Sequence, residues 1–169
     1  MKYTDLGKTG LRVSKLGFGG MRLPMSGEGS RKTVNRELAI PMILRAFKLG
    51  VNYIDSAVGY CNEDSQRAVG DALKEWRGEK IIVSTKNIYY GNSKKIWRSH
   101  LENSLERIGL NSIDVYHNHS VTYKDWTKFL KPKMTKWMIQ AKDEGLVKHI
   151  ALSFHDKPEY LKEIIHTGY

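Results

Sequence analysis

Apolar residues form two kinds of run that alternate along most of the chain. Short runs rich in Val and Ile predict strands over residues 51–56, 81–85, 113–116 and 149–153. Longer stretches with apolar residues three and four positions apart predict helices over residues 38–49, 62–76, 93–108, 123–144 and 158–166, with a break at Pro132. Near the N-terminus, two short runs around a Gly-bounded turn at residues 7–10 predict a β-hairpin, and the polar stretch that follows residues 17–20, as far as Asn35, is expected to form a loop. About five strand–helix units in strict alternation predict parallel strands with helices packed outside them.

This pattern leaves two parallel architectures open, a doubly wound sheet and a barrel. The chain has 169 residues, which makes a single domain the default. A complete (β/α)8 barrel needs roughly 250 residues. A barrel is therefore expected only in an incomplete form.

Composition narrows the class of protein further. The only cysteine, Cys61, excludes a disulfide framework and any metal site made of cysteines alone, and it favours a cytoplasmic location. No apolar run reaches about 18 residues, so we expect no membrane span. The net charge of +10 suggests an anionic partner. However, the alternating lysines and aromatic residues of segment 126–142 fit an outer helix with a solvated lysine face better than a nucleic-acid surface.

Chemically capable side chains gather where the predicted strands end. In parallel α/β folds, the carboxyl ends of the strands and the loops after them hold the functional groups. Asp55 and Tyr60 follow one strand, Lys86 follows the next, and His119 the one after. An ammonium lowers the pKa of a neighbouring phenol, a carboxylate can hold that ammonium, and a neutral imidazole can donate to a carbonyl oxygen. The set therefore suits protonation of an oxygen that gains negative charge when a hydride attacks a carbonyl group.

The same strand ends allow a second chemistry. His117 and His119 lie two residues apart on one face of a strand, and His155 follows the next strand. Three imidazoles can bind zinc and activate a water molecule, which would make the protein a metal-dependent hydrolase.

Four motifs follow one another along the chain. Residues 50–60 read G-V-N-Y-I-D-S-A-V-G-Y, and residues 65–73 read S-Q-R-A-V-G-D-A-L. Residues 84–86 read S-T-K, and residues 113–119 read I-D-V-Y-H-N-H. With these motifs the sequence resembles the aldo-keto reductase family from the hairpin to the last residue, with Gln66 where the family has Glu.

The resemblance implies a (β/α)8 TIM-barrel type of fold with a bottom-capping hairpin. About the first five β/α units are present, so residues 1–169 are expected to form a single domain that is incomplete at the C-terminus. The implied reaction is NADPH-dependent reduction of a small-molecule aldehyde or ketone, with NADH left open. By resemblance, Tyr60 is the general acid, Lys86 and Asp55 adjust it, and His119 orients the carbonyl group. The residues that the resemblance places at the cofactor are Gly20, Met21, Arg22, Asp55 and Ser153.

One position departs from the family pattern. A Ser-Asn pair is expected to hold the nicotinamide carboxamide, but Ser153 is followed by Phe154, whose side chain neither donates nor accepts a hydrogen bond. The run Ser-Phe-His is more similar to a branch that is often joined to a C-terminal ferredoxin-like iron–sulfur domain. This chain has no cysteine cluster of that kind.

The length also keeps a non-enzymatic alternative open. If three units of the barrel are lacking, the chain is an inactive fragment or pseudo-enzyme that acts only through protein contacts. Its first and fifth strands would then be exposed edges, through which self-association is expected.

Overall fold

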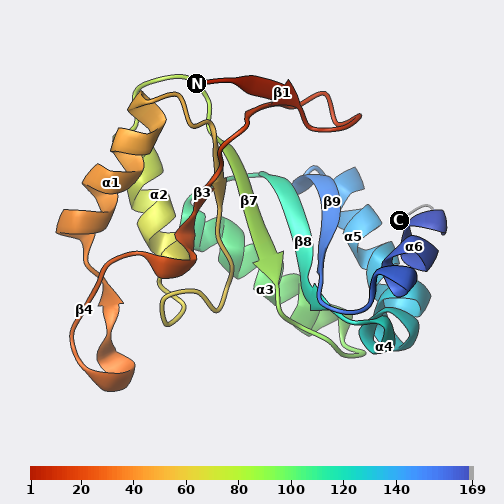
Figure 1. The fold of residues 1–169 in the computed structure, drawn as a ribbon. Coiled ribbons are helices and arrows are strands. Elements are labelled where there is room, and N and C mark those ends of the chain that lie inside the picture. The colour runs from red at the N-terminus through yellow and green to blue at the C-terminus, as the bar shows by residue number, and fades with distance from the viewer. Residues whose placement is uncertain (168–169) are drawn as a thin grey trace.

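A computed structural model describes residues 1–167 and shows a parallel sheet backed by helices (Figure 1). The sheet has five strands in the order β3-β6-β7-β8-β9, and every neighbouring pair is parallel. Since spatial order follows chain order without a reversal, the sheet has the topology of a barrel wall and not of a doubly wound fold. The strands are β3 (Phe18–Gly19), β6 (Tyr53–Asp55), β7 (Ile82–Asn87), β8 (Ile113–Val121) and β9 (Val147–Phe154).

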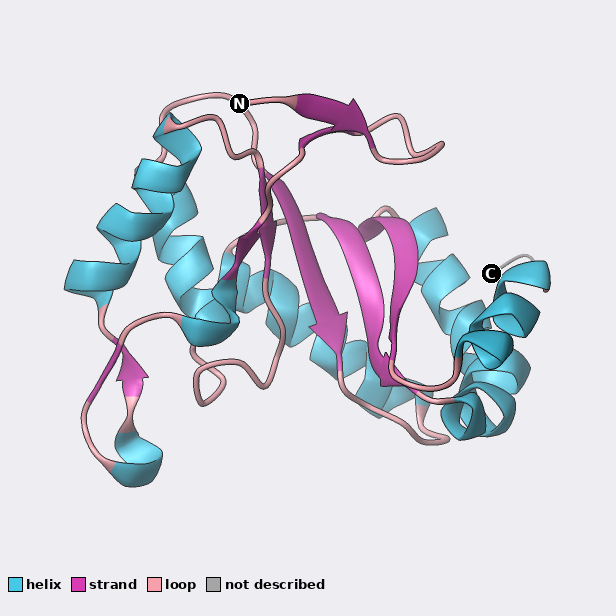
Figure 2. Ribbon diagram, in the orientation of Figure 1, coloured by secondary structure: helices cyan, strands magenta, loops and turns pink. Residues whose placement is uncertain are grey.

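Helices follow the strands as the alternating pattern predicts, and they gather on one side of the sheet (Figure 2). Ser93 caps the third of them by accepting from the amide of Ile96, and Gly109 ends it in the left-handed conformation, with φ of 77°. The main helices within residues 1–167 are α1 (Arg36–Lys48), α2 (Ser65–Glu75), α3 (Lys94–Ile108), α5 (Thr135–Asp143) and α6 (Pro158–His166). No helix within residues 1–167 is long and apolar enough to cross a membrane.

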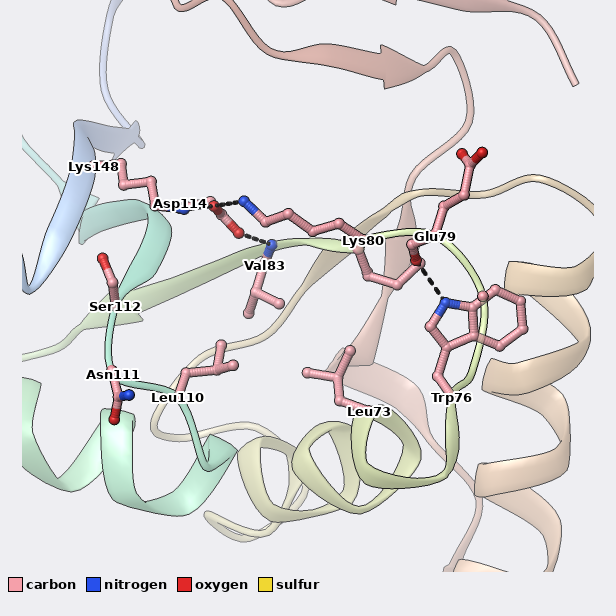
Figure 3. A pocket seen from close by; sticks show the side chains of 12 residues that line it. Leu73, Trp76, Glu79, Lys80, Val83, Leu110, Asn111, Ser112, Asp114 and Lys148 are labelled. Carbon is pink, nitrogen blue, oxygen red and sulfur yellow. Dashed lines mark hydrogen bonds and ion pairs between the residues drawn. The ribbon is translucent and has the colours of Figure 1, made fainter.

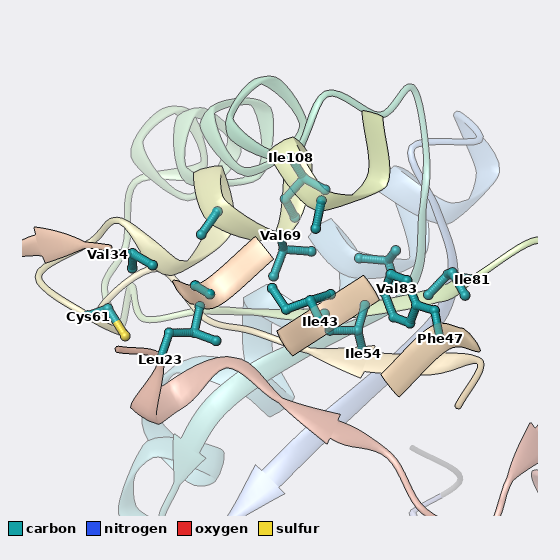
Figure 4. Packing of buried hydrophobic residues seen from close by; sticks show 13 residues of the cluster. Leu23, Val34, Ile43, Phe47, Ile54, Cys61, Val69, Ile81, Val83 and Ile108 are labelled. Carbon is teal, nitrogen blue, oxygen red and sulfur yellow. The ribbon is translucent and has the colours of Figure 1, made fainter. Parts of the chain in front are cut away.

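Two apolar clusters join the helices to the outer face of the sheet. The first, seen in Figure 4, packs Ile43 and Phe47 of α1 and Val69 of α2 against Ile54 and Val83 of the strands. The second cluster contains residues of α3, α5, α6, β8, β9 and the π-helical stretch η3 (Trp126–Met134), among them Trp97, Leu101, Tyr116, Leu130, Met138, Val147 and Ile164.

The opposite face of the sheet lines the interior of the partial barrel. The predicted hairpin, β1 (Tyr3–Asp5) with β2 (Arg12–Ser14), lies across the amino-terminal ends of the strands (Figure 1). Val13 of this hairpin packs against Ile82 and Val115 at the bottom of the interior. Asn52 anchors the hairpin, because its side chain accepts from the amide of Ser14 at 2.7 Å and donates to the carbonyl of Arg12 at 3.0 Å. Apolar side chains therefore fill the amino-terminal end of the interior.

One predicted helix start was wrong because contacts between residues distant in sequence decide the local conformation. The helix expected from residue 62 begins at Ser65, since Cys61, Asn62 and Glu63 adopt positive φ angles of 52°, 53° and 64°. Asp64 does not cap this helix with its side chain; its carboxylate binds Arg36 at 2.7 Å and the amide of Val34 at 2.8 Å.

Other segments are more ordered than the pattern predicts. The segment expected as a loop contains a second small hairpin, β4 (Met25–Ser26) with β5 (Thr33–Val34), and two 3-10 turns, η1 (Gly20–Arg22) and η2 (Gly29–Arg31). The expected break at Pro132 takes the form of a π-helical stretch, η3 (Trp126–Met134), between the short α4 (Tyr123–Asp125) and α5. A proline lacks the amide proton that a regular helix uses there, and the wider turn accommodates it.

Candidate active site

Strand register brings the predicted catalytic residues to one end of the sheet. Asp55 of β6 pairs with Ser84 of β7, and Lys86 of β7 pairs with His117 of β8. Because side chains alternate between the two faces of a strand, Ser84 and Lys86 share the interior face. The carboxyl ends of three neighbouring strands thus direct polar groups into one space.

Lys86 is the centre of this space, and its side chain is held from several directions. The residue is only 6% exposed, which requires partners for its charge. Its Nζ forms an ion pair with Oδ2 of Asp55 and donates to the carbonyl of Ser56 at 2.8 Å. The same Nζ lies 4.8 Å from the centre of the Tyr60 ring. The structure therefore brings together Asp55, Lys86 and Tyr60, as the sequence predicts.

His119 completes the group from the third strand. Its ring meets the Tyr60 ring edge-on, with centroids 5.7 Å apart and planes at 80°. Burial and, after it, the charge of Lys86 lower the pKa of His119, so the imidazole is neutral at pH 7. A neutral imidazole beside a phenol can donate to an oxygen atom that both groups share.

Ser84 is a residue of this site that the sequence analysis missed. Its hydroxyl lies 2.9 Å from Oδ1 of Asp55 and 3.0 Å from Nε2 of His117. Burial and the nearby ammonium of Lys86 lower the pKa of His117 to about 4, so this imidazole is neutral. The two-residue spacing from Lys86 was the available signal, because it puts Ser84 on the same face one layer deeper.

A bulge in β8 sets the position of His119. The pairing of β8 with β9 shifts between Asn118 and Val121, and Ser120 there has a φ of 57°. The backbone amide of Ser120 donates to Oγ of Ser153 at 2.7 Å, and the Tyr90 hydroxyl donates to the carbonyl of His119. Bulges of this kind redirect side chains near functional sites. The apolar run at residues 113–116 predicts a strand that ends at residue 116, whereas β8 continues to Val121 and contains this bulge.

The three predicted cofactor residues of the first loop, Gly20, Met21 and Arg22, differ in burial, whereas Asp55 and Ser153 are half-buried. Gly20 is buried, and a Cβ there would lie 2.7 Å from Oγ of Ser65 and 3.1 Å from the carbonyl of Asp55. This close approach explains the glycine, since it lets the turn η1 lie directly against the end of β6. Met21 and Arg22, the next residues of the turn, are exposed.

This chain is similar to known proteins over nearly its whole length. The model of the Aldo/keto reductase family matches residues 15–169. The chain belongs to the aldo-keto reductase family. Among solved structures, this chain is similar to an aldo-keto reductase from Bacillus halodurans in its holo form, with 29% identity and a TM-score of 0.80 over 98% of this chain.

Curated proteins of similar sequence match most of this chain. NADH-specific methylglyoxal reductase from Escherichia coli (strain K12) is 27% identical, covering 99% of this chain and 56% of that protein. A probable voltage-gated potassium channel subunit beta from Arabidopsis thaliana is 34% identical, covering 70% of this chain and 37% of that protein. The Bacillus halodurans structure is matched over 54% of its own chain. The chain thus spans about half the length of the relatives it matches.

The zinc alternative is wrong for the described part of this chain. Residues 1–167 contain no group of three His, Cys, Asp or Glu side chains that could hold a metal ion. His117 is turned into the interior, where Nε2 meets the Ser84 hydroxyl, whereas His155 is exposed beyond the end of β9. His117, His119 and His155 therefore do not form the predicted metal site.

Proposed function

We propose that this chain carries the catalytic groups of a carbonyl reductase that transfers a hydride from a nicotinamide cofactor to a small aldehyde or ketone. One observation carries the proposal: a buried Lys86, held by Asp55, lies against the ring of Tyr60 beside a neutral His119. The family supports an oxidoreductase role of this kind.

Each side chain has one task in this proposal. Tyr60 gives its phenolic proton to the substrate oxygen as that oxygen gains negative charge. The Lys86 ammonium then stabilises the phenolate that remains, and Asp55 keeps the ammonium in place. His119 donates a hydrogen bond to the same oxygen and so orients the carbonyl group.

The residues around this site fit the nicotinamide end of a cofactor, which would supply the hydride when bound. Ser153 accepts from the Ser120 amide and keeps its own hydroxyl proton, so it can donate to a carboxamide oxygen. The turn with exposed Met21 and Arg22 would border the cofactor beside Asp55. NADPH and NADH are both candidates, and the Escherichia coli relative is named as NADH-specific.

The test is cofactor oxidation by the purified chain with methylglyoxal as the first substrate. We expect Tyr60→Phe to lower kcat by at least about 100-fold, the range for loss of a general acid, and to leave the Kd for the cofactor unchanged. Tyr160→Phe is the matched control, since it removes a hydroxyl from a tyrosine that stacks on Tyr123. Full turnover in Tyr60→Phe would refute the acid role.

A non-enzymatic role is the second candidate, and the exposure of β9 favours it. All six residues of β7 are buried, whereas residues 149–154 of β9 are only half-buried. Such a strand offers pairing groups to another chain. A protein that neither binds nor oxidises either nicotinamide, yet forms a stable complex or self-associates, would favour this candidate over the reductase.

A further inference from the structure

A cavity lies at the opposite end of the strands from Tyr60 and Lys86. It has a volume of about 390 Å³ and opens between the amino-terminal ends of β7, β8 and β9 and the ends of α2 and α3 (Figure 3). Leu73 and Leu110 form its apolar floor, and Trp76 lies at one side. The proposed reductase chemistry uses none of these residues.

Two ammonium groups stand together at the polar edge of this cavity. Nζ of Lys80 and Nζ of Lys148 lie 2.7 Å and 2.8 Å from the same oxygen, Oδ1 of Asp114. The other oxygen of Asp114 accepts from the amide of Val83 at 3.0 Å, and this carboxylate is only 4% exposed. A single buried carboxylate thus fixes two ammonium groups side by side.

The local charge favours an anion with one negative charge. Asp114 neutralises one of the two lysines, which leaves a net charge of +1, and each ammonium keeps donors that Asp114 does not use. The exposed Glu79 also borders the cavity, but Figure 3 shows its carboxylate pointing away from Asp114 and from the two leucines.

A buried hydroxyl offers a third donor at the same place. Oγ of Ser112 is inaccessible to solvent and has no hydrogen-bond partner among the residues that the structure describes. Buried hydroxyl groups are usually satisfied, so a ligand atom at this position would remove a free-energy cost. Ser112 lines the cavity beside Asn111 and Asp114 (Figure 3).

We propose that this cavity binds a small aromatic carboxylate. The carboxylate would lie between Lys80, Lys148 and the Ser112 hydroxyl, where charge-assisted hydrogen bonds are strongest. Its ring would cover Leu73 and Leu110 and meet the side of Trp76, as apolar pockets with a few convergent polar groups hold small ligands. A doubly charged phosphate ester would be only half neutralised here and would lie close to the Asp114 carboxylate.

The experiment measures binding of indole-3-acetate and of its neutral amide to the full chain by isothermal titration calorimetry at low salt. We expect the acid to bind at least about tenfold more tightly than the amide, which corresponds to one charge-assisted hydrogen bond. Lys148→Gln should weaken binding of the acid by about tenfold. Lys74→Gln makes the same change in charge on the exposed face of α2, outside the cavity, and should leave the affinity within about twofold.

Leu110→Trp provides an independent test, because it fills the floor of the cavity and leaves both lysines in place. Binding of the acid should disappear in this variant while the circular dichroism spectrum stays that of the parent chain. Equal affinity for acid and amide, equal effects of Lys148→Gln and Lys74→Gln, or unchanged binding in Leu110→Trp would each overturn the proposal. Amide shifts in NMR spectra that lie away from residues 80, 112 and 148 would overturn it as well.

Discussion

Replacing Gly70 by Ala tests how tightly α2 packs on α3. Gly70 lies in the middle of α2, and a Cβ there would lie 2.6 Å from the carbonyl oxygen of Ile108 and 2.9 Å from that of Arg107. Both atoms belong to backbone at the end of α3, where the amide of Gly109 already binds two carbonyl groups of the last turn. The new methyl group therefore cannot be accommodated by rotation of a side chain.

The expected magnitude is a balance of two effects. Inserting a methyl group into well-packed backbone costs about 2–3 kcal/mol. Alanine recovers about 1 kcal/mol relative to glycine inside a helix. Gly70→Ala should therefore lower the free energy of unfolding by about 1–2 kcal/mol, which shifts the urea midpoint by about 0.5–1 M.

Urea unfolding followed by circular dichroism measures this difference directly. Gly59→Ala is the matched control, because a Cβ at Gly59 meets no heavy atom within 4 Å and needs no positive φ. Its midpoint should stay within the range of about 0.5 kcal/mol that is usual for surface substitutions. A Gly70→Ala protein as stable as the parent chain, or more stable, would refute the packing argument.

Three further predictions concern polar contacts. Burial alone would raise the pKa of Asp114, but hydrogen bonds from Lys148, Lys80 and the Val83 amide outweigh burial and lower this pKa. Asp114 therefore stabilises the fold fully above the unfolded value of about 3.9, and this contribution is lost as the pH falls from that value through the lowered pKa of the folded state. Asp114→Asn should thus lower stability at pH 7 and flatten the decline of stability below about pH 4 in urea titrations; an unchanged acid decline would contradict this. Asn52→Ala removes two hydrogen bonds to the first hairpin and should speed amide exchange in residues 12–14 but not in β8, whereas uniform exchange would argue against a local anchor. Ser84→Ala should lower reductase kcat by about tenfold or more without changing the cofactor Kd, because Asp55 loses one of its fixed donors; equal kcat would show that Lys86 alone positions Asp55.

Much of the architecture follows from the sequence because local and global preferences agree. The Val-Ile run that became β7 is buried over its whole length, and Gly109 ends α3 as its position predicts. Asp55 and Lys86 meet because parallel strands in sequential order place their carboxyl ends together. These features depend on periodicity and chain order, which a sequence displays directly.

Other features depend on contacts that no local pattern encodes. The left-handed turn at residues 61–63 is held beside an Arg36–Asp64 ion pair that joins positions 28 residues apart. The bulge at Ser120 depends on the Ser153 hydroxyl of the next strand. Ser84 could be placed on a face from its spacing, but its role as a link between Asp55 and His117 required the strand register.

The alternation of faces along the strands has a consequence for how this protein can change. On β7, Val83 belongs to the apolar cluster under the helices, whereas Ser84 and Lys86 face the interior. Stability and chemistry are thus assigned to alternate positions of the same short segment. Substitutions at positions such as Ser84 and Lys86 can alter the reaction or the preferred substrate without disturbing the packing of Val83 under the helices. On a strand of this kind, natural or laboratory selection can change the activity while the fold is retained.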